Sequence, residues 1–317
     1  MDLMYHLYKL PLAMINFPIE KEEFLENFFE KKPGLFRGAA SDCKFDWLGI
    51  DEAIYASQSS PLKIKIHSGK EYLSPESYEW KCVEVGVLKS QLNAVEIHRH
   101  LDNGATLVFN RMESLSLKVR NVCRQISDFL SMSVVANGYI SFGKQGSFGD
   151  HWDTHDVFAV QLIGRKNWKI YNSTFKLPIE GQTSRDQKHL RPIHPELDFT
   201  LEEGDVAYIP RGWWHSATAI GEPTFHIAAG IHTNKYLDYI DWIVRTKLKN
   251  RESLRTSLPL HDMQIFNLDK IIEDVNQEIR SLKNITEYIE GMKSQTVVAS
   301  DMGMAEYAKR LRERNSL

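Results

Sequence analysis

Cysteine is scarce in this chain, which has only Cys43, Cys82 and Cys123 among 317 residues. The three are far apart and no two form a CxxC pair, so the sequence has the pattern of neither a zinc ribbon nor a redox dithiol. Few cysteines and no disulfide framework are typical of a reducing cytosol. We therefore expect a cytoplasmic protein.

Long apolar runs and a strong net charge are also absent from the sequence. No window approaches the roughly 20 apolar residues of a membrane-spanning helix. The N-terminal segment 1–17 lacks the basic start, apolar run and cleavage site of a signal peptide. The net charge of −3 gives the whole molecule no electrostatic reason to bind nucleic acid or an anionic membrane. We expect a soluble protein with neither partner.

What the chain does have is a β-rich middle between helical ends. Short β-branched and aromatic runs, separated by turn residues, predict strands at 134–142, 157–163, 168–171, 206–210 and 224–231. This pattern is typical of a barrel or a double-sheet jelly roll. Shorter strands are expected at 35–38, 62–66, 83–88 and 105–109. Segment 172–198 reads as a long loop over the barrel.

Apolar residues at helical spacing predict the remaining elements. The expected helices cover 20–32, 51–57, 90–101, 113–132, 236–248, 268–292 and 305–314. We therefore expect a first domain at 1–234 with an N-terminal α/β elaboration and a barrel core at about 133–232. A helical region follows at 235–317.

Three residues have the chemistry of a metal site. His151 and Asp153 are two apart, which on a strand places both side chains on one face. His215, from a different strand, completes the two imidazoles and one carboxylate that hold non-haem Fe(II) in a facial triad. The alternative is that all three are buried polar residues satisfied by hydrogen bonds. His155 has the same parity and competes for the same role.

Lys166 follows the turn Gly164–Arg165 and enters a predicted strand. A cation at the inner end of that strand can hold one carboxylate of a dicarboxylate while the metal chelates the keto-acid end. Without a metal site, Arg165 and Lys166 would be a solvated turn.

The segments 104–110, 135–139, 148–158, 161–171 and 204–215 together resemble the core of the Jumonji-C 2-oxoglutarate oxygenases. The similarity is greatest to the cupin-like ribosomal oxygenases, which hydroxylate ribosomal proteins. It covers about 105–232, with a fainter match at 33–39. It implies a double-stranded β-helix of the cupin or jelly-roll type, mainly β with flanking helices.

The resemblance also implies a reaction and a set of roles. Fe(II), 2-oxoglutarate and O2 would hydroxylate a side chain of a protein or peptide, with succinate and CO2 as co-products. His151, Asp153 and His215 would bind Fe(II), and Lys166 would pair with the distal carboxylate of 2-oxoglutarate. The residues expected to line the co-substrate pocket are Asn137 and Tyr139. His226 is expected to be a core histidine.

The chain departs from that group after the barrel. The ribosomal oxygenases usually continue through a helical dimerisation region to a winged-helix-like domain, whereas only 235–317 follow the barrel here. We expect a homodimer. A protein side chain, ribosomal or not, is the leading substrate class, with a small peptide as the second.

Three other readings remain open. A demethylase would use the same cofactors on an N-methyl group and release formaldehyde. A cupin-like binding protein would keep the ligand residues without turnover. A cupin isomerase or dioxygenase would use the metal without 2-oxoglutarate. The basic run 185–191 is either a docking patch for an acidic or ribosomal partner or a solvated loop.

Overall fold

The computed structural model describes residues 14–58, 64–69, 71–144, 148–257, 268–293 and 307. The chain divides into two compact units, which are Met1–His232 with Met302–Leu317, and Thr233–Asp301. The helix expected at 305–314 lies, apart from residue 307, outside the described residues. No helix within the described ranges is long and apolar enough to cross a membrane.

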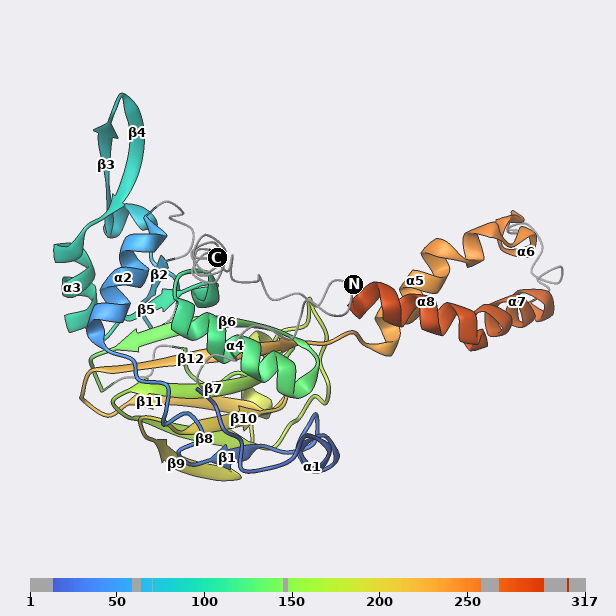
Figure 1. The fold of residues 1–317 in the computed structure, drawn as a ribbon, viewed down its shortest axis with the longest axis horizontal. Coiled ribbons are helices and arrows are strands. Elements are labelled where there is room, and N and C mark those ends of the chain that lie inside the picture. The colour runs from blue at the N-terminus through green and yellow to red at the C-terminus, as the bar shows by residue number, and fades with distance from the viewer. Residues whose placement is uncertain are drawn as a thin grey trace, which may run out of the picture. The chain divides into compact units, whose positions relative to one another are not determined.

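Two antiparallel sheets form the centre of the first unit (Figure 1). The larger has the order β1-β10-β7-β12-β6-β5-β2 and the smaller has the order β11-β8-β9. The strands of the larger sheet, in that order, are Gly34–Phe36, Val206–Ile209, Asp156–Ile163, Thr224–His232, Ser133–Ser141, Thr106–Phe109 and Ile64–His67. Those of the smaller are Trp214–Ala219, Lys166–Tyr171 and Leu197–Leu201. The predicted mainly β core with flanking helices is confirmed, although β9 and β11 were not predicted.

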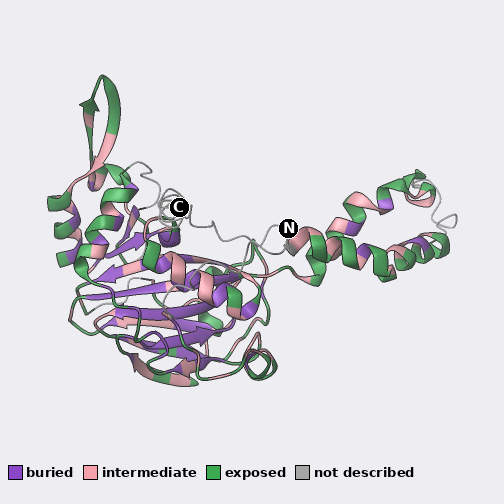
Figure 2. Ribbon diagram, viewed as in Figure 1, coloured by how far each residue is buried: buried purple, intermediate pink, exposed green. Residues whose placement is uncertain are grey.

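Strand alternation separates a cavity-facing side of the larger sheet from a core-facing side. In β6, Asn137, Tyr139 and Ser141 line a cavity, whereas Ala136 and Ile140 belong to the main hydrophobic core. β12 alternates in the same way. Its cavity-facing residues are His226, Ala228, Gly230 and His232, and its core-facing residues are Phe225, Ile227, Ala229 and Ile231. Most of each strand is buried (Figure 2).

Helices supply the other side of that core. The α-helices of the first unit are α1 (Lys21–Asn27), α2 (Trp47–Ser57), α3 (Ala94–Asp102) and α4 (Leu117–Leu130), and its 3-10 turns are η3 (Pro75–Ser77), η4 (Met112–Ser114) and η5 (Arg185–Leu190). Helix α4 lies beside β6 (Figure 1). Its buried residues recur at helical spacing, and they are Val119, Val122, Cys123, Ile126, Ser127 and Leu130. This apolar stripe against the sheet explains why α4 forms where the sequence predicts a helix.

The N-terminal elaboration differs from the expectation at 83–92. A single β segment was expected at 83–88, followed by a helix from residue 90. Instead, β3 (Glu79–Glu84) and β4 (Val87–Leu92) form a hairpin whose two turn residues, Val85 and Gly86, have φ of 50° and 75°. Positive φ at both positions defines a tight hairpin turn, and a valine there conceals the usual turn signal. Helix α3 starts later because the side chain of Asn93 accepts hydrogen bonds from the first turn.

The second unit is helical. Its elements are α5 (Tyr236–Thr246), η6 (Leu248–Asn250), α6 (Glu252–Arg255), α7 (Asp269–Arg280) and α8 (Leu282–Lys293). The single helix expected at 268–292 is interrupted at Ser281, whose ψ of 113° is extended. Asn284 stabilises this break, since its side-chain nitrogen donates to the carbonyl of Glu278 at 3.0 Å. The rings of Tyr239 and Tyr288 pack edge to face and join α5 to α8.

Candidate metal centre and its cavity

His151 and His215 are held side by side by their own backbones. Each N–H donates to the carbonyl of the other, at 3.1 and 2.8 Å, which makes an isolated antiparallel bridge at the start of β11. Each ring is oriented by a backbone carbonyl beside its Nδ1 atom. Nδ1 of His151 lies 3.0 Å from the carbonyl of Gly149, and Nδ1 of His215 lies 3.0 Å from that of Trp213. With Nδ1–H donating, each Nε2 carries the lone pair that a metal needs.

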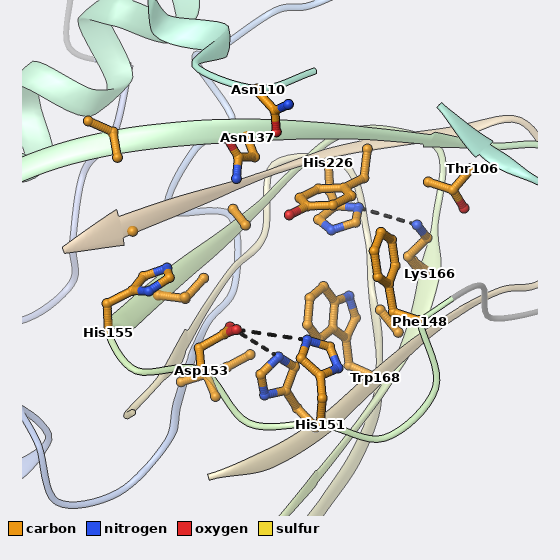
Figure 3. A pocket seen from close by; sticks show the side chains of 18 of the residues that line it. Thr106, Asn110, Asn137, Phe148, His151, Asp153, His155, Lys166, Trp168 and His226 are labelled. Carbon is orange, nitrogen blue, oxygen red and sulfur yellow. Dashed lines mark hydrogen bonds and ion pairs between the residues drawn. The ribbon is translucent and has the colours of Figure 1, made fainter. Parts of the chain in front are cut away.

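Asp153 faces both Nε2 atoms (Figure 3). One carboxylate oxygen is 3.5 Å from His215 Nε2 and the other is 4.0 Å from His151 Nε2. The three ligand atoms lie within 4.8 Å of one another. Neighbouring ligands of one ion with bonds near 2.1 Å are about 3 Å apart, so a small contraction would make this a tripod. No other such group of three occurs in the described part of the chain.

The electrostatics of the three groups suit a metal. Burial, and then the neighbouring His151, lower the pKa of His215 to about 4, so the imidazole is neutral at pH 7. Burial acts to raise the pKa of Asp153, but His151 and then His215 hold that pKa below the usual value for aspartate. A neutral imidazole and an ionised carboxylate are donors of the kind that hold non-haem Fe(II).

The local backbone differs from the strand that the His-x-Asp spacing suggested. β7 begins only at Asp156, and the segment from His151 to Asp156 is irregular after the bridge. His151 and Asp153 still converge, but His155 does not join them. Its ring lies instead over Gly230 of β12. The backbone N–H of Gly212 donates a hydrogen bond of 3.0 Å to the carbonyl of Asp153. This bond fixes the irregular segment to the loop before β11.

A cavity of about 660 Å³ lies around the triad. Its deep end is closed by buried residues, among them Lys166 and His226, which are 3% and 4% exposed. Nζ of Lys166 lies 3.3 Å from Nδ1 of His226 and 3.4 Å from Oγ of Ser141 (Figure 3). Ser141 in turn contacts Thr106 at 3.0 Å. The alternative of a solvated turn at Lys166 is therefore not observed, because this side chain is buried and lines the cavity.

Burial shifts the pKa values of the groups at the closed end of the cavity. It lowers the pKa of Lys166 to about 7. Burial, and then the ammonium group of Lys166, hold the pKa of His226 well below its usual value. Burial also raises the pKa of Tyr139, so its phenol is neutral. A cation here without a counter-charge is suited to an anionic ligand.

The remaining predicted residues also line the cavity. Tyr139 stacks on His226, with centroids 5.0 Å apart, and Asn137 accepts a hydrogen bond from the backbone of Arg111 at 3.1 Å. Sequence reasoning missed Ser141 and Thr106. Ser141 has the same parity as Asn137 and Tyr139 on one strand, which was an available signal. Thr106 enters through the pairing of β5 with β6, which the sequence alone does not reveal.

Comparison with known proteins agrees with this geometry. Residues 113–239 match the family model described as the JmjC domain. This range contains the triad, Lys166 and most of both sheets. Over this range the chain is therefore similar to the JmjC domain.

Particular relatives extend over more of the chain. One is the bifunctional lysine-specific demethylase and histidyl-hydroxylase NO66 of Drosophila persimilis, 26% identical over 268 residues, which are 81% of this chain and 37% of that protein. Another is ribosomal oxygenase 2 of Rattus norvegicus, 25% identical over 300 residues, which are 90% of this chain and 61% of that protein. The chain spans less than two thirds of the length of either relative.

Solved structures share the fold. The X-ray structure of Escherichia coli YcfD has a TM-score of 0.61 at 18% identity, covering 88% of this chain and 73% of that one. A second structure of YcfD, described as a ribosomal oxygenase in complex with cobalt and 2-oxoglutarate, has a TM-score of 0.59 at 17% identity and covers 87% and 71%. Both comparisons cover more of this chain than residues 113–239. The structural similarity therefore extends beyond the segment that matches the JmjC family model.

Proposed function

We propose that this protein is an Fe(II)- and 2-oxoglutarate-dependent oxygenase that hydroxylates an amino-acid side chain of a protein. One observation carries the proposal, namely that a His-Asp-His tripod shares one cavity with a buried lysine that has no carboxylate partner among the described residues. The tripod fits Fe(II), and Lys166 fits the far carboxylate of a dicarboxylate. A cupin isomerase without 2-oxoglutarate would leave Lys166 without a role.

In this proposal His151, Asp153 and His215 hold Fe(II) on one face and leave its other positions to co-substrate and oxygen. When bound, the iron supplies the oxidising chemistry, with 2-oxoglutarate and O2 converted to succinate and CO2. The backbone bridge between the two histidines holds their main chains side by side. The carbonyls of Gly149 and Trp213 fix the tautomers, so the ligands are oriented before metal binds.

Lys166 is proposed to bind and orient 2-oxoglutarate. Its ammonium group is the cation at the closed end, and Tyr139 and Asn137 line the same cavity. The buried position excludes water, which strengthens the ion pair with a carboxylate. Ser141 and Thr106 add hydroxyl donors beside Lys166.

The proposed substrate is a protein, with a ribosomal protein as the first candidate and a peptide as the second. The relatives named as histidyl-hydroxylase and ribosomal oxygenase support this class. We place the protein in the cytoplasm, with no direct nucleic-acid or membrane partner, as the net charge of −3 suggests.

We also propose that residues 1–234 form the oxygenase domain and 235–317 a region for homodimerisation. Tyr236, Ile240 and Val244 follow one another at four-residue spacing along α5 and are 91%, 41% and 50% exposed. An exposed apolar stripe of this kind is typical of a helix that packs against a partner. Sedimentation of the wild type and of Ile240→Asp would test it, because the variant should shift a dimer to monomer, and a wild-type monomer would contradict it.

Anaerobic titration of the apo-protein with Fe(II) and then 2-oxoglutarate tests the main proposal. The wild type should develop the visible metal-to-ligand charge-transfer band. His151→Ala should lose it, Lys166→Ala should weaken it, and His98→Ala, on an exposed face of α3, should keep it. Iron binding without a band would favour a cupin enzyme that does not use 2-oxoglutarate. Absence of iron binding would favour a non-catalytic protein.

A further inference from the structure

Trp152 lies between two of the proposed metal ligands, His151 and Asp153, and its backbone is outside the strands that the structure describes. His151 is held by its bridge to His215, and β7 begins only at Asp156. Trp152 is 4% exposed, so its backbone N–H and carbonyl need partners inside the protein. The loop that carries the two ligands therefore depends on side chains from another part of the chain.

Ser184 supplies a partner for both groups. The backbone N–H of Trp152 donates to Oγ of Ser184 at 3.2 Å, and the same hydroxyl donates to the carbonyl of Trp152 at 3.5 Å. Ser184 is itself 6% exposed. It lies just before η5, in the segment 172–196 between β8 and β9 (the β8–β9 segment). Because a hydroxyl can accept and donate at once, this one side chain takes the place of a neighbouring strand.

Arg191 of the same segment holds the residue before His151. Its Nε forms an ion pair of 2.9 Å with the carboxylate of Asp150. Its guanidinium lies over the ring of Tyr171, 4.4 Å from the centroid, and Tyr171 is buried at the end of β8. Ion pairs near the surface are usually weak, because ordering two long side chains costs entropy. Here the contact with a buried ring fixes the guanidinium, so the pair has a defined place.

The β8–β9 segment also contacts the tryptophans next to the ligands. Trp152 stacks on Phe175, with centroids 5.7 Å apart and planes at 12°. Trp214, which precedes the third ligand, donates from Nε1 to Oγ1 of Thr174 at 2.8 Å. Both tryptophans belong to a separate buried cluster, and neither is among the described residues that line the cavity. The segment thus contacts the neighbours of all three ligands without entering the cavity.

We propose that Ser184 and Arg191 are positioning residues, through which the β8–β9 segment holds the loop 150–153 in the geometry that binds the metal. This inference rests on the proposed metal site, and both residues act through Trp152 and Asp150 rather than on the ligand atoms. A loop that is held before the ion arrives loses less conformational freedom on binding, so removal of a support should lower metal affinity.

Co(II) binding to the apo-protein tests the role of Ser184, with calorimetry for the affinity and the visible spectrum for the coordination geometry. Ser184→Ala leaves the N–H of Trp152 without its acceptor. It should raise the Kd for Co(II) by about tenfold, the effect of losing a group that orients a ligand, and should shift the visible bands. Ser184→Thr keeps the hydroxyl and should restore both the Kd and the bands.

Ser127→Ala is the matched control, because Ser127 of α4 is 7% exposed and its Oγ donates to the carbonyl of Met132 at 2.6 Å. Both alanine variants remove a buried hydrogen bond, so both should lower the Tm of the apo-protein. Only Ser184→Ala should change the Kd for Co(II) and the visible bands.

For Arg191→Leu, the sign of the change in Kd separates positioning from charge. Loss of the cation leaves the carboxylate of Asp150 unpaired, and this more negative surrounding would by Coulomb attraction lower the Kd for Co(II). Loss of positioning should instead raise the Kd several-fold. Arg99→Leu, which loses an exposed ion pair with Glu96 on α3, should keep the wild-type Kd.

Three results would contradict the inference. An unchanged Kd in Ser184→Ala, or an unchanged or lower Kd in Arg191→Leu, would remove that residue from the positioning role, and the two results together would overturn the proposal. An equal rise of the Kd in Ser127→Ala would also overturn it, because the effect would then follow from stability alone. A wild type that binds no Co(II) would refute the metal site itself, and with it the proposed oxygenase.

Discussion

His151 and His215, which are 64 positions apart in the sequence, exchange two backbone hydrogen bonds of 3.1 and 2.8 Å. The two residues are therefore cross-strand neighbours whatever the orientation of their side chains. Their relative position is part of the sheet, so it is present before any metal arrives. His151 follows a loop, whereas His215 lies at the start of a strand. The bridge between them explains why both still face Asp153.

The first prediction follows from that bridge. His151→Ala removes one ligand but keeps both backbone bonds, and its side chain is 33% exposed. We expect the apo-protein to change its unfolding free energy by less than about 1 kcal/mol, whereas affinity for Mn(II) or Co(II) falls by about a hundredfold or more. Thermal unfolding and calorimetry measure the two effects, with His98→Ala as the control. A large loss of stability would mean that the imidazole itself supports the fold.

A second prediction concerns the buried lysine. Burial lowers the pKa of Lys166 from 10.5 to about 7, so between these values the unfolded chain binds a proton that the folded protein does not. Stability therefore rises with pH across this window, and the cost of burying the ammonium group is fully present only below pH 7. Lys166→Met, of similar length, should stabilise the apo-protein at pH 6 by about 1–4 kcal/mol.

The same variant should gain less at pH 9, where the wild-type amine is already neutral in the folded state. Denaturant unfolding of both proteins at pH 6 and pH 9 checks the sign, and 2-oxoglutarate binding to Lys166→Met should be weakened at either pH. An equal gain at both pH values would show that Lys166 does not titrate near 7. Lys169→Met, on the neighbouring exposed position of β8, is the matched control.

Much of this site could be predicted because its residues are close to strong local patterns. His151 and Asp153 precede an apolar strand, and Lys166 opens the next one. The role of His155 could not be deduced from parity, since the backbone between the bridge and β7 is irregular. The ring of His155 lies where a side chain at position 230 would otherwise be, so its position depends on Gly230. Gly230 is distant in the sequence and is brought close by strand pairing.

Strands were missed where the local signal was weak. β11 starts immediately after the Gly212 turn, and its serine, threonine and alanines lack the usual β-branched run. It is a strand because all six residues pair with β8. β9 begins at the end of the expected loop 172–198 and was not predicted, although it too is defined by pairing with β8. In both cases tertiary hydrogen bonds outweigh local propensity.

A third prediction compares two glycines. Gly212 has φ of +82°, and an added Cβ would lie 2.3 Å from the carbonyl oxygen of Phe175. Its N–H also holds the carbonyl of Asp153. Gly212→Ala should therefore destabilise the protein by about 1–3 kcal/mol and weaken metal binding. Gly291→Ala, in helix α8 with open space around it, should be neutral or stabilising by up to about 1 kcal/mol. Thermal unfolding should give a lower Tm for Gly212→Ala than for Gly291→Ala. Equal Tm values would contradict the contact between the added Cβ and the carbonyl of Phe175.

The last prediction concerns Arg211, a buried cation that connects the segment 172–198 to the start of β7. Its guanidinium donates to Glu30 at 2.6 Å and to the carbonyl of Pro178 at 3.1 Å, and it lies 4.0 Å from Asp156. Asp156 is 1% exposed. Since Glu30 is 30% exposed and water can solvate it, the main cost of Arg211→Leu falls on Asp156.

Burial already raises the pKa of Asp156, and removal of the neighbouring cation should raise it further. With the folded pKa above the unfolded value, the folded state binds the extra proton, so stability falls as pH rises through this window. Arg211→Leu should thus lose about 3 kcal/mol at pH 7 and less at pH 5, where a larger fraction of the carboxyl is protonated. Urea unfolding at the two pH values measures this, with the exposed Arg245→Leu expected to keep the wild-type Tm. A deficit that is larger at pH 5 would mean that Arg211 acts through the loop carbonyls and not through Asp156.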